Sequence, residues 1–332
     1  STPKPSSAAS DVYKRQLLGG CTSTSVTEKY QDKRNDIINV KDKVIEFETG
    51  NVLIGSVSRL YMSNKCLLIA DHKSVDKQIH IFNKNDFSYL TSIGNFGEGP
   101  EEITVMGCLA IDEAHHQLYV SDHAKQKIFS YDMDSVMVDS LYKPQVKTAM
   151  NETLFPSEYQ YINDTLSIAV LIKPTSTSTF NQFLGRWNMN TGEMIPMKYT
   201  HPDIQKKRIT FAASEKAGIY VECYTRHDLM TICSLDGELL YNIYGPDWDG
   251  GNGNKLQSFG TVMIGNDKIF VSYCGEDYAR DSFPTKILVF DLEGNYLKTL
   301  ETGYKISDCC YDSFNNRIIL SLNDVVQFAY LD

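Results

Sequence analysis

Several signatures of enzymes and of nucleic-acid-binding proteins are missing from this sequence of 332 residues. It contains no G-x-S-x-G or H-E-x-x-H motif, no P-loop and no complete G-x-G-x-x-G, so no catalytic residue is predicted. The net charge is −10 and no basic cluster occurs, which argues against a nucleic-acid partner. No apolar run approaches the ~18 residues that a membrane-spanning helix needs.

Cysteine also lacks any recognisable pairing or metal-binding pattern. Apart from Cys21, seven cysteines remain, and an odd number cannot all form disulfides. No spacing among them resembles a zinc site, and Cys309 and Cys310 are adjacent. Since most lie in strand-like segments, we expect them to be small buried hydrophobic residues.

The most informative feature that is present is a short strand pattern that occurs six times. It reads apolar-x-apolar-x, usually with a small fourth residue, at 67–70, 118–121, 166–169, 219–222, 269–272 and 318–321. Successive fourth positions are 51, 48, 53, 50 and 49 residues apart. Near-constant periods of this size indicate a repeat architecture such as a propeller.

The second repeat shows the structural unit best. Polar turns separate four predicted strands, at 107–112, 117–121, 127–131 and 136–141. Such a sheet buries both of its faces only by packing against copies of itself around an axis. The chain ends on a third strand, at 328–332, and the alternating segment 43–48 can supply the fourth. The sequence therefore predicts an all-β, six-bladed β-propeller with four-stranded antiparallel blades, closed by an N-terminal strand in the last blade.

The N-terminal 42 residues divide into three predicted segments. Residues 1–16 include D-V-Y-K-R-Q, which resembles a translated sequencing adapter and is left out of the fold. Residues 17–21 read L-L-G-G-C, which resembles the lipobox of bacterial lipoproteins and makes Cys21 the predicted lipidation site. Residues 22–42 are predicted to be a tether, and 43–332 the propeller.

Two motifs carry a resemblance to known families. The second repeat, L-Y-V-S-D-H at 118–123 followed by K-I-F-S-Y-D at 127–132, resembles NHL and TolB-like six-bladed propellers. The loop G-N-F-G-E-G-P-E-E-I at 94–103 is similar to a signature between blades in propeller lipoproteins of Bacteroides and relatives. With the lipobox, the resemblance extends over nearly all of residues 17–332. It implies an outer-membrane lipoprotein of the cell envelope, anchored to the membrane by its lipid, and no reaction.

Asp-His pairs occur at equivalent positions in two repeats, at 71–72 and 122–123. They could orient an imidazole for catalysis or bind a metal. Alternatively, the aspartates cap the turn that follows the second strand. Because adjacent residues on an extended chain point in opposite directions, we favour the turn-capping interpretation.

Two inter-blade loops on the same rim are the candidate ligand-binding region, since loops on a rigid scaffold often carry function. The candidate residues are Glu98, Glu101, Glu102 and Trp248. The second loop also offers possible Ca²⁺ ligands, although it lacks the spacing of an EF-hand: Asp247, Asp249, Asn252 and Asn254. The acidic rim favours a cation, a basic peptide or a hydroxyl-rich sugar as ligand.

The sequence thus favours a binding or scaffold module with a glycan, peptide or protein ligand. Two alternatives stay open. The first is a metal-dependent propeller hydrolase or lactonase, which would need acidic or Asn side chains at the inner ends of several first strands. The second is a subunit of an envelope protein complex. The T-S-T-S stretch at 22–25 lacks the acidic run that resembles a surface-export signal in these bacteria. We therefore expect the protein to lie on the periplasmic face of the outer membrane.

Overall fold

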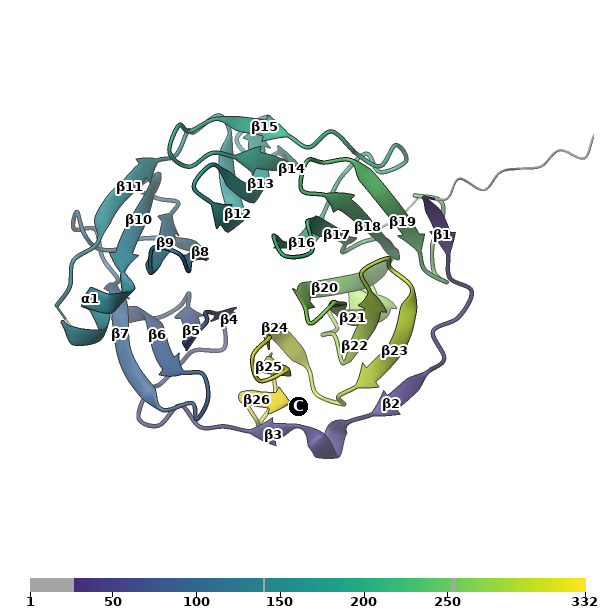
Figure 1. The fold of residues 1–332 in the computed structure, drawn as a ribbon, viewed down its shortest axis with the longest axis horizontal. Coiled ribbons are helices and arrows are strands. Elements are labelled where there is room, and N and C mark those ends of the chain that lie inside the picture. The colour runs from purple at the N-terminus through teal and green to yellow at the C-terminus, as the bar shows by residue number, and fades with distance from the viewer. Residues whose placement is uncertain (1–26, 140, 252–254) are drawn as a thin grey trace, which may run out of the picture.

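The computed structural model describes residues 27–139, 141–251 and 255–332. Within them, six sheets lie around a central axis, and the first strand of each antiparallel four-stranded blade is innermost (Figure 1). The predicted six-bladed β-propeller is therefore confirmed, and the repeated pattern lies in the second strand of every blade. No helix in the described ranges combines the length and the apolar character needed to cross a bilayer.

Blades 1 to 3 are each built from consecutive strands. Blade 1 contains β4 (Ser58–Met62), β5 (Cys66–Asp71), β6 (Lys77–Asn83) and β7 (Tyr89–Asn95). Blade 2 contains β8 (Met106–Asp112), β9 (Gln117–Asp122), β10 (Lys127–Asp132) and β11 (Gln145–Ala149). Blade 3 contains β12 (Phe155–Asn163), β13 (Leu166–Pro174), β14 (Phe180–Trp187) and β15 (Met194–Pro196).

Blades 4 to 6 each take an additional strand from the N-terminal segment. Blade 4 contains β16 (Ile209–Ser214), β17 (Ile219–Tyr224), β18 (Leu229–Ser234) and β19 (Leu239–Tyr244), with β1 (Glu28–Tyr30) outside. Blade 5 contains β20 (Leu256–Gly265), β21 (Lys268–Asp277), β22 (Lys286–Asp291) and β23 (Tyr296–Glu301), with β2 (Ile37–Asn39) outside. Blade 6 contains β24 (Ile306–Asp312), β25 (Arg317–Leu322), β26 (Phe328–Leu331) and β3 (Ile45–Glu46). Two 3₁₀ turns are η1 (Lys41–Lys43) and η2 (Tyr278–Arg280).

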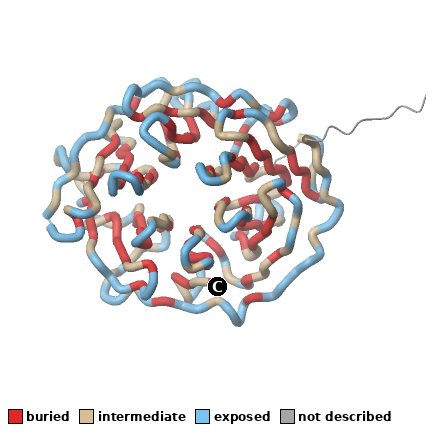
Figure 2. The backbone as a smooth tube through the Cα atoms, viewed as in Figure 1, coloured by how far each residue is buried: buried red, intermediate tan, exposed pale blue. Residues whose placement is uncertain are grey.

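The repeated pattern is apolar because the second strands are buried on both faces. In β5, Leu68 and Ala70 pack toward blade 2, whereas Leu67 and Ile69 pack toward blade 6. Strands buried on both faces are expected to be almost continuously hydrophobic. Each neighbouring pair of blades shares one such hydrophobic cluster in the described residues, and Figure 2 shows the buried segments within the blades.

One predicted strand is wrong. Residues 136–141 do not form the fourth strand of blade 2, because a short helix, α1 (Met133–Val138), begins directly after β10. Asp132 caps this helix by accepting a hydrogen bond from the backbone N–H of Ser135. Val136 is buried against the core, and the fourth strand follows only at β11. A short apolar run does not distinguish a buried helical turn from a strand.

The predicted closure by residues 43–48 is confirmed. β3 pairs antiparallel with β26, and the backbone N–H of Phe47 donates to the carbonyl of Phe328 at 3.1 Å. The Phe47 ring is buried and stacks on Phe87 of blade 1, with ring centroids 3.9 Å apart. The closing segment thus joins the last blade to the first.

The segment predicted to be a tether behaves differently. Its described part, together with the closing strand, forms what we call the N-terminal strap (residues 27–47), which runs along the outer edge of blades 4, 5 and 6 (Figure 1). β1 pairs parallel with β19, and β2 pairs parallel with β23. Between them, the guanidinium of Arg34 forms a 2.9 Å ion pair with Asp228, and both side chains are buried. This part of the chain is therefore propeller structure rather than a linker.

The seven cysteines are free and buried, as expected. Burial raises the pKa of the Cys108 thiol to about 12, which keeps it protonated and unreactive. The fourth position of the blade 4 repeat holds Glu222 in place of the usual small residue. This side chain is buried as well, and the ammonium of Lys207 lies 2.6 Å from its carboxylate. A charge in a second strand is thus tolerated because it is paired. The predicted lipidation site, Cys21, lies outside the described residues.

Candidate functional site

The first strands of all six blades line a cavity of about 420 Å³ on the propeller axis. At one end this cavity meets a second one of about 440 Å³, and the two share Arg59, Thr261 and Asp308 in their walls. Volumes of this size are within the range of small-molecule pockets. The three shared residues come from blades 1, 5 and 6, so they form a polar level where the central tunnel widens.

An ion pair crosses this polar level. The guanidinium of Arg59 in blade 1 donates two parallel hydrogen bonds to Glu158 in blade 3, at 2.9 and 3.1 Å. Bidentate pairs of this kind fix both side chains in orientation as well as in distance. About a third of the Arg59 side chain and somewhat more of Glu158 remain exposed. A molecule in the tunnel can therefore reach charged groups that are already held in place.

Asp308 forms the part of the polar level that belongs to blade 6. Its carboxylate accepts hydrogen bonds from the backbone N–H of Leu60 at 2.8 Å and from the Thr261 hydroxyl at 2.7 Å. Burial raises the pKa of Asp308, while the positive charge of Arg59 opposes that rise. The aspartate thus connects blade 6 to blades 1 and 5 and adds an acceptor beside Arg59.

Aromatic side chains surround the polar groups of the tunnel. The cavity on the propeller axis is lined by Tyr61, Tyr159, Tyr161, Phe211 and Tyr311. The hydroxyls of Tyr61 and Tyr159 have no hydrogen-bond partner within the described chain. The tunnel wall therefore combines aromatic side chains with the polar groups of Arg59, Glu158, Thr261 and Asp308.

In both Asp-His pairs, the aspartate and the histidine have different roles. The Asp122 carboxylate accepts backbone hydrogen bonds from Thr104 and Ala124, and Asp71 does the same for Gly55 and Lys73. These contacts support the turn-capping interpretation.

The histidines of these pairs lie close to the Arg59–Glu158 pair. Burial lowers the pKa of His72 and of His123. A Cβ on Gly107 would come within 2.2 Å of the His123 ring, so only glycine leaves room for this imidazole beside the first strand of blade 2. The histidines thus support the tunnel wall, and the aspartates shape the turns.

The candidate acids of the first loop have mostly local partners. Glu102 accepts a hydrogen bond from the backbone N–H of Gly99 at 2.8 Å, which closes the loop on itself. Exposed Glu101 lies 2.7 Å from the ammonium of Lys143, and Glu98 is also exposed. Lys125 donates to the backbone carbonyls of this loop, which attaches it to the neighbouring turn of blade 2. These contacts stabilise the loop; Glu98, Glu101 and Glu102 stay candidates for binding.

Trp248 in the second loop is packed among other rings. It contacts His201, His227 and Tyr244, with ring centroids 5.0 to 6.0 Å apart, and is only partly exposed. Asp247 donates its backbone N–H to Asp228 and accepts from the Tyr273 hydroxyl.

The calcium hypothesis for this loop stays a prediction. The carboxylate of Asp249 lies 3.8 Å from the Nδ1 atom of His227. The other two proposed ligands, Asn252 and Asn254, lie outside the described residues, so the loop's four oxygen donors are not seen together.

Comparison with known proteins gives a consistent picture of the fold. Residues 22–181 match the DUF5128 family of six-bladed β-propellers. That match covers just under half of the chain. No curated protein matches the sequence.

Solved structures of similar fold come from several kinds of protein. A candidate exported protein of Bacteroides fragilis superposes with a TM-score of 0.58 and 13% identity, covering 89% of this chain and 87% of that one. A DUF4221 member from Bacteroides vulgatus gives 0.56 and 11%, covering 90% and 98%. A streptogramin B lyase gives 0.54 and 10%, covering 87% and 96%. At these identities the likeness concerns the fold alone.

Sequence reasoning missed the three residues of the polar level. A signal for two of them was present, because Arg59 pairs with Ala70 and Asp308 pairs with Ser321, each the fourth residue of its repeat. In blade 3 the residue opposite this position is Tyr159 rather than Glu158, so the rule finds Arg59 and Asp308 but not the partner of Arg59.

Proposed function

We propose that this propeller is a binding module of the bacterial cell envelope and that a short, hydroxyl-rich ligand such as a glycan binds in its central tunnel. The observation that carries the proposal is the fixed set of charged groups, Arg59, Glu158 and Asp308, at the level where the two tunnel cavities meet. A binding or scaffold role also fits the absence of catalytic motifs from the sequence.

The chemistry of the lining favours a neutral, hydroxylated ligand. Glu158 and Asp308 are acceptors, and the guanidinium of Arg59 is a donor, so alternating hydroxyl groups can be matched without bringing in net charge. The tyrosine and phenylalanine rings of the cavity offer apolar faces of the kind that stack on sugar rings.

The hydrolase alternative is less well supported by the same contacts. A tunnel metal would need several carboxylates converging on one point. Both oxygens of Glu158 instead accept hydrogen bonds from Arg59, and both oxygens of Asp308 accept hydrogen bonds from blades 1 and 5. The arrangement is suited to holding a molecule.

The tunnel proposal is tested with a glycan array followed by calorimetric titration of the purified chain. Glu158→Gln and Thr261→Val are expected to weaken binding of the selected glycan at least tenfold. Asp236→Asn, which affects an exposed ion pair with Arg186, is the matched control and leaves the affinity unchanged. Equal affinity in all four proteins, or no glycan bound at millimolar concentration, overturns the proposal. Circular dichroism checks that each variant is folded.

The location in the envelope rests on the sequence of residues 17–21 and on the fold shared with a candidate exported Bacteroides protein. We expect a lipid on Cys21, attachment to the outer membrane and exposure to the periplasm. With a signal peptide restored, Cys21→Ser should move the protein from the membrane to the soluble fraction of a Bacteroides host. Unchanged fractionation contradicts the lipid anchor, and protease accessibility on intact cells contradicts the periplasmic side. Co-purification from the same cells tests the role as a subunit of an envelope complex.

A further inference from the structure

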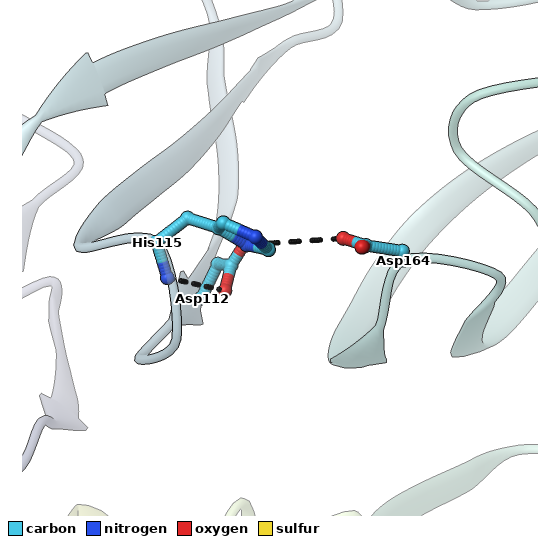
Figure 3. Close-up of side chains that lie close together, drawn as sticks. All are labelled: Asp112, His115 and Asp164. Carbon is cyan, nitrogen blue, oxygen red and sulfur yellow. Dashed lines mark hydrogen bonds and ion pairs between the residues drawn. The ribbon is translucent and has the colours of Figure 1, made fainter.

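A cluster of potential metal ligands lies away from the tunnel polar level, where the turns of blades 2 and 3 approach each other. Asp112, His115 and Asp164 each offer one ligand atom, and these atoms lie within 4.8 Å of one another (Figure 3). It is the one group of three or more His, Cys, Asp or Glu side chains that lies this close together in ranges 27–139, 141–251 and 255–332. In an antiparallel blade, the turn after the first strand lies on the rim opposite to the inter-blade loops.

Each member of the cluster is positioned by its own turn. Asp112 is the buried last residue of β8, and its Oδ1 accepts a hydrogen bond from the backbone N–H of His115. This bond curls the turn so that the imidazole lies back over the same carboxylate. Asp164 lies in the turn between β12 and β13, and its carbonyl accepts a hydrogen bond from Asn190. The two turns approach each other from separate blades.

The arrangement presents two carboxylates to a single ring nitrogen. The Nδ1 atom of His115 lies 2.9 Å from Oδ2 of Asp112 and 3.8 Å from Oδ1 of Asp164. One N–H can donate a good hydrogen bond to only one of these oxygens, and 3.8 Å is too long for the other. A cation between the three atoms would be in contact with all of them at once.

The donor spacing suits a small divalent cation. Tetrahedral coordination with bonds of about 2.0–2.1 Å places donor atoms roughly 3.3 Å apart. The two separations at His115 lie on either side of that value, and two of the three side chains are more than half exposed and can adjust. One imidazole nitrogen with two carboxylate oxygens is a donor set typical of Zn²⁺, whereas Ca²⁺ requires six or more oxygens.

A second set of side chains holds the carboxylates in place. The hydroxyl of Tyr119 donates to Oδ2 of Asp112 at 3.2 Å, and the hydroxyl of Tyr161 donates to Oδ1 of Asp164 at 2.7 Å. Hydrogen bonds of this kind orient the side chains that coordinate the metal in metalloproteins. The Lys147 ammonium lies 5.5 Å from the Tyr119 ring centroid, so one positive charge stands near the cluster.

We infer that Asp112, His115 and Asp164 form a binding site for a divalent transition-metal ion of the Zn²⁺ class, with water completing its coordination. The ion bridges blades 2 and 3, which share no backbone pairing in the described sheets. Its expected role is to fix the relative position of the two turns. This inference is independent of the tunnel ligand, because none of the three proposed metal ligands is among the charged groups of the polar level; Tyr161, which donates to Asp164, also lines the tunnel cavity.

The test is calorimetric titration of the purified chain, without a polyhistidine tag, with ZnCl₂ in a non-chelating buffer. We expect one ion per chain and a rise in the thermal midpoint on addition of zinc. His115→Ala and Asp164→Asn should each weaken zinc binding at least tenfold. Both side chains are more than half exposed, so we expect the variants to fold, and circular dichroism verifies this.

The matched control is His116→Ala. This neighbouring histidine lies in the same turn, and its Nδ1 atom lies 2.7 Å from the carboxylate of Asp134. Among the described residues it forms no ion pair with another blade. Zinc affinity should be unchanged in it. The inference is overturned if the parent binds no zinc up to millimolar concentration, if His115→Ala binds as tightly as the parent, or if His116→Ala loses binding to the same extent.

Discussion

The two halves of the ring are held together in different ways. Each sheet of blades 4 to 6 receives a strand from the N-terminal strap, whereas blades 1 to 3 consist of their own four strands (Figure 1). The strapped half contains the buried pairs Arg34–Asp228 and Lys207–Glu222. In the other half, the pairs Arg59–Glu158 and His115–Asp164 remain partly exposed.

This difference separates stabilising charges from charges that are available to a ligand. Removing one partner of a buried pair strongly destabilises the folded protein, because the other partner is left as an uncompensated charge in a low-dielectric interior. A half-exposed pair contributes little to stability and can interact with an incoming molecule. We therefore expect mutations at the buried pairs Arg34–Asp228 and Lys207–Glu222 to affect folding, and mutations at the half-exposed pair Arg59–Glu158 to affect binding.

The largest expected effect is that of Arg34→Ala. The variant leaves the carboxylate of Asp228 buried without its cation, and burial already raises the pKa of this group while Arg34 opposes the rise. Breaking a buried ion pair from one side costs about 3–5 kcal/mol of unfolding free energy. Urea denaturation followed by circular dichroism measures the loss.

Two controls make the comparison specific. The double variant Arg34→Ala, Asp228→Asn should recover part of the lost stability, since no unpaired charge remains. Arg280→Ala removes one member of an exposed pair with Glu276 and should leave the denaturation midpoint unchanged. A loss below about 1 kcal/mol in Arg34→Ala would show that the strap is not held by this pair.

Phe47→Ala should have the next largest effect. The ring is buried between blades 6 and 1 and stacks on Phe87, so its removal leaves a cavity at the point of closure. Replacing a buried phenylalanine by alanine costs about 3 kcal/mol or more. Leu53→Ala, at a residue that is 94% exposed in the segment after the closing strand, is the control. Equal midpoints for the two variants would contradict the role of Phe47 in closure.

Much of this fold follows from the sequence, because the second strands are buried on both sides and so repeat the same apolar pattern. The strap was not predicted, since β1 and β2 are only three residues each, neither contains a buried residue, and their pairing partners lie more than 200 residues away. α1 was missed because the short apolar run that follows Asp132 is compatible with a strand as well as with a helical turn capped by Asp132.

The site was less predictable than the fold. Arg59 and Glu158 lie 99 residues apart and meet only because the ring brings blades 1 and 3 to one axis. Asp112 and His115 are three residues apart, but nothing in the local pattern shows that Asp164 of the next blade faces them. Trp248, predicted as a binding platform, packs against His201 and Tyr244, stays partly exposed and remains a candidate for binding. Contacts between blades decide these outcomes.

Acid should destabilise the protein through five histidines. Burial lowers the pKa of each of them: His72, His80, His123, His201 and His227. Below the ordinary histidine pKa of about 6.5, the unfolded chain takes up protons that the folded chain does not, and so stability falls as pH falls. The calorimetric midpoint is expected to decrease steadily from pH 7.5 to pH 5.

The same titration sharpens the comparison between the halves. Three of these histidines lie in blades 1 and 2, outside the strapped half. His72→Gln should therefore reduce the slope of midpoint against pH without changing the midpoint at pH 8 by much, because a neutral polar side chain replaces a neutral imidazole. A midpoint that is flat or rises toward pH 5 would contradict the assignment of these imidazoles as neutral in the folded protein.

The smallest effect is expected at the acidic loop of blade 1, where two neighbouring glutamates differ in their contacts. Glu101 forms an ion pair with the exposed ammonium of Lys143. Such a pair is screened by water and salt, so Glu101→Ala should not change the denaturation midpoint measurably. Glu102 accepts a hydrogen bond from the backbone of Gly99, and Glu102→Ala leaves that N–H without a protein acceptor, at a cost of about 1 kcal/mol. The variants also test the ligand proposal, since neither residue lines the tunnel cavities and neither change should alter glycan affinity. A tenfold loss of affinity in Glu101→Ala with an unchanged midpoint would instead place the binding surface on this rim. The charged side chains of blades 1 to 3 that contact the ligand would then lie outside the tunnel.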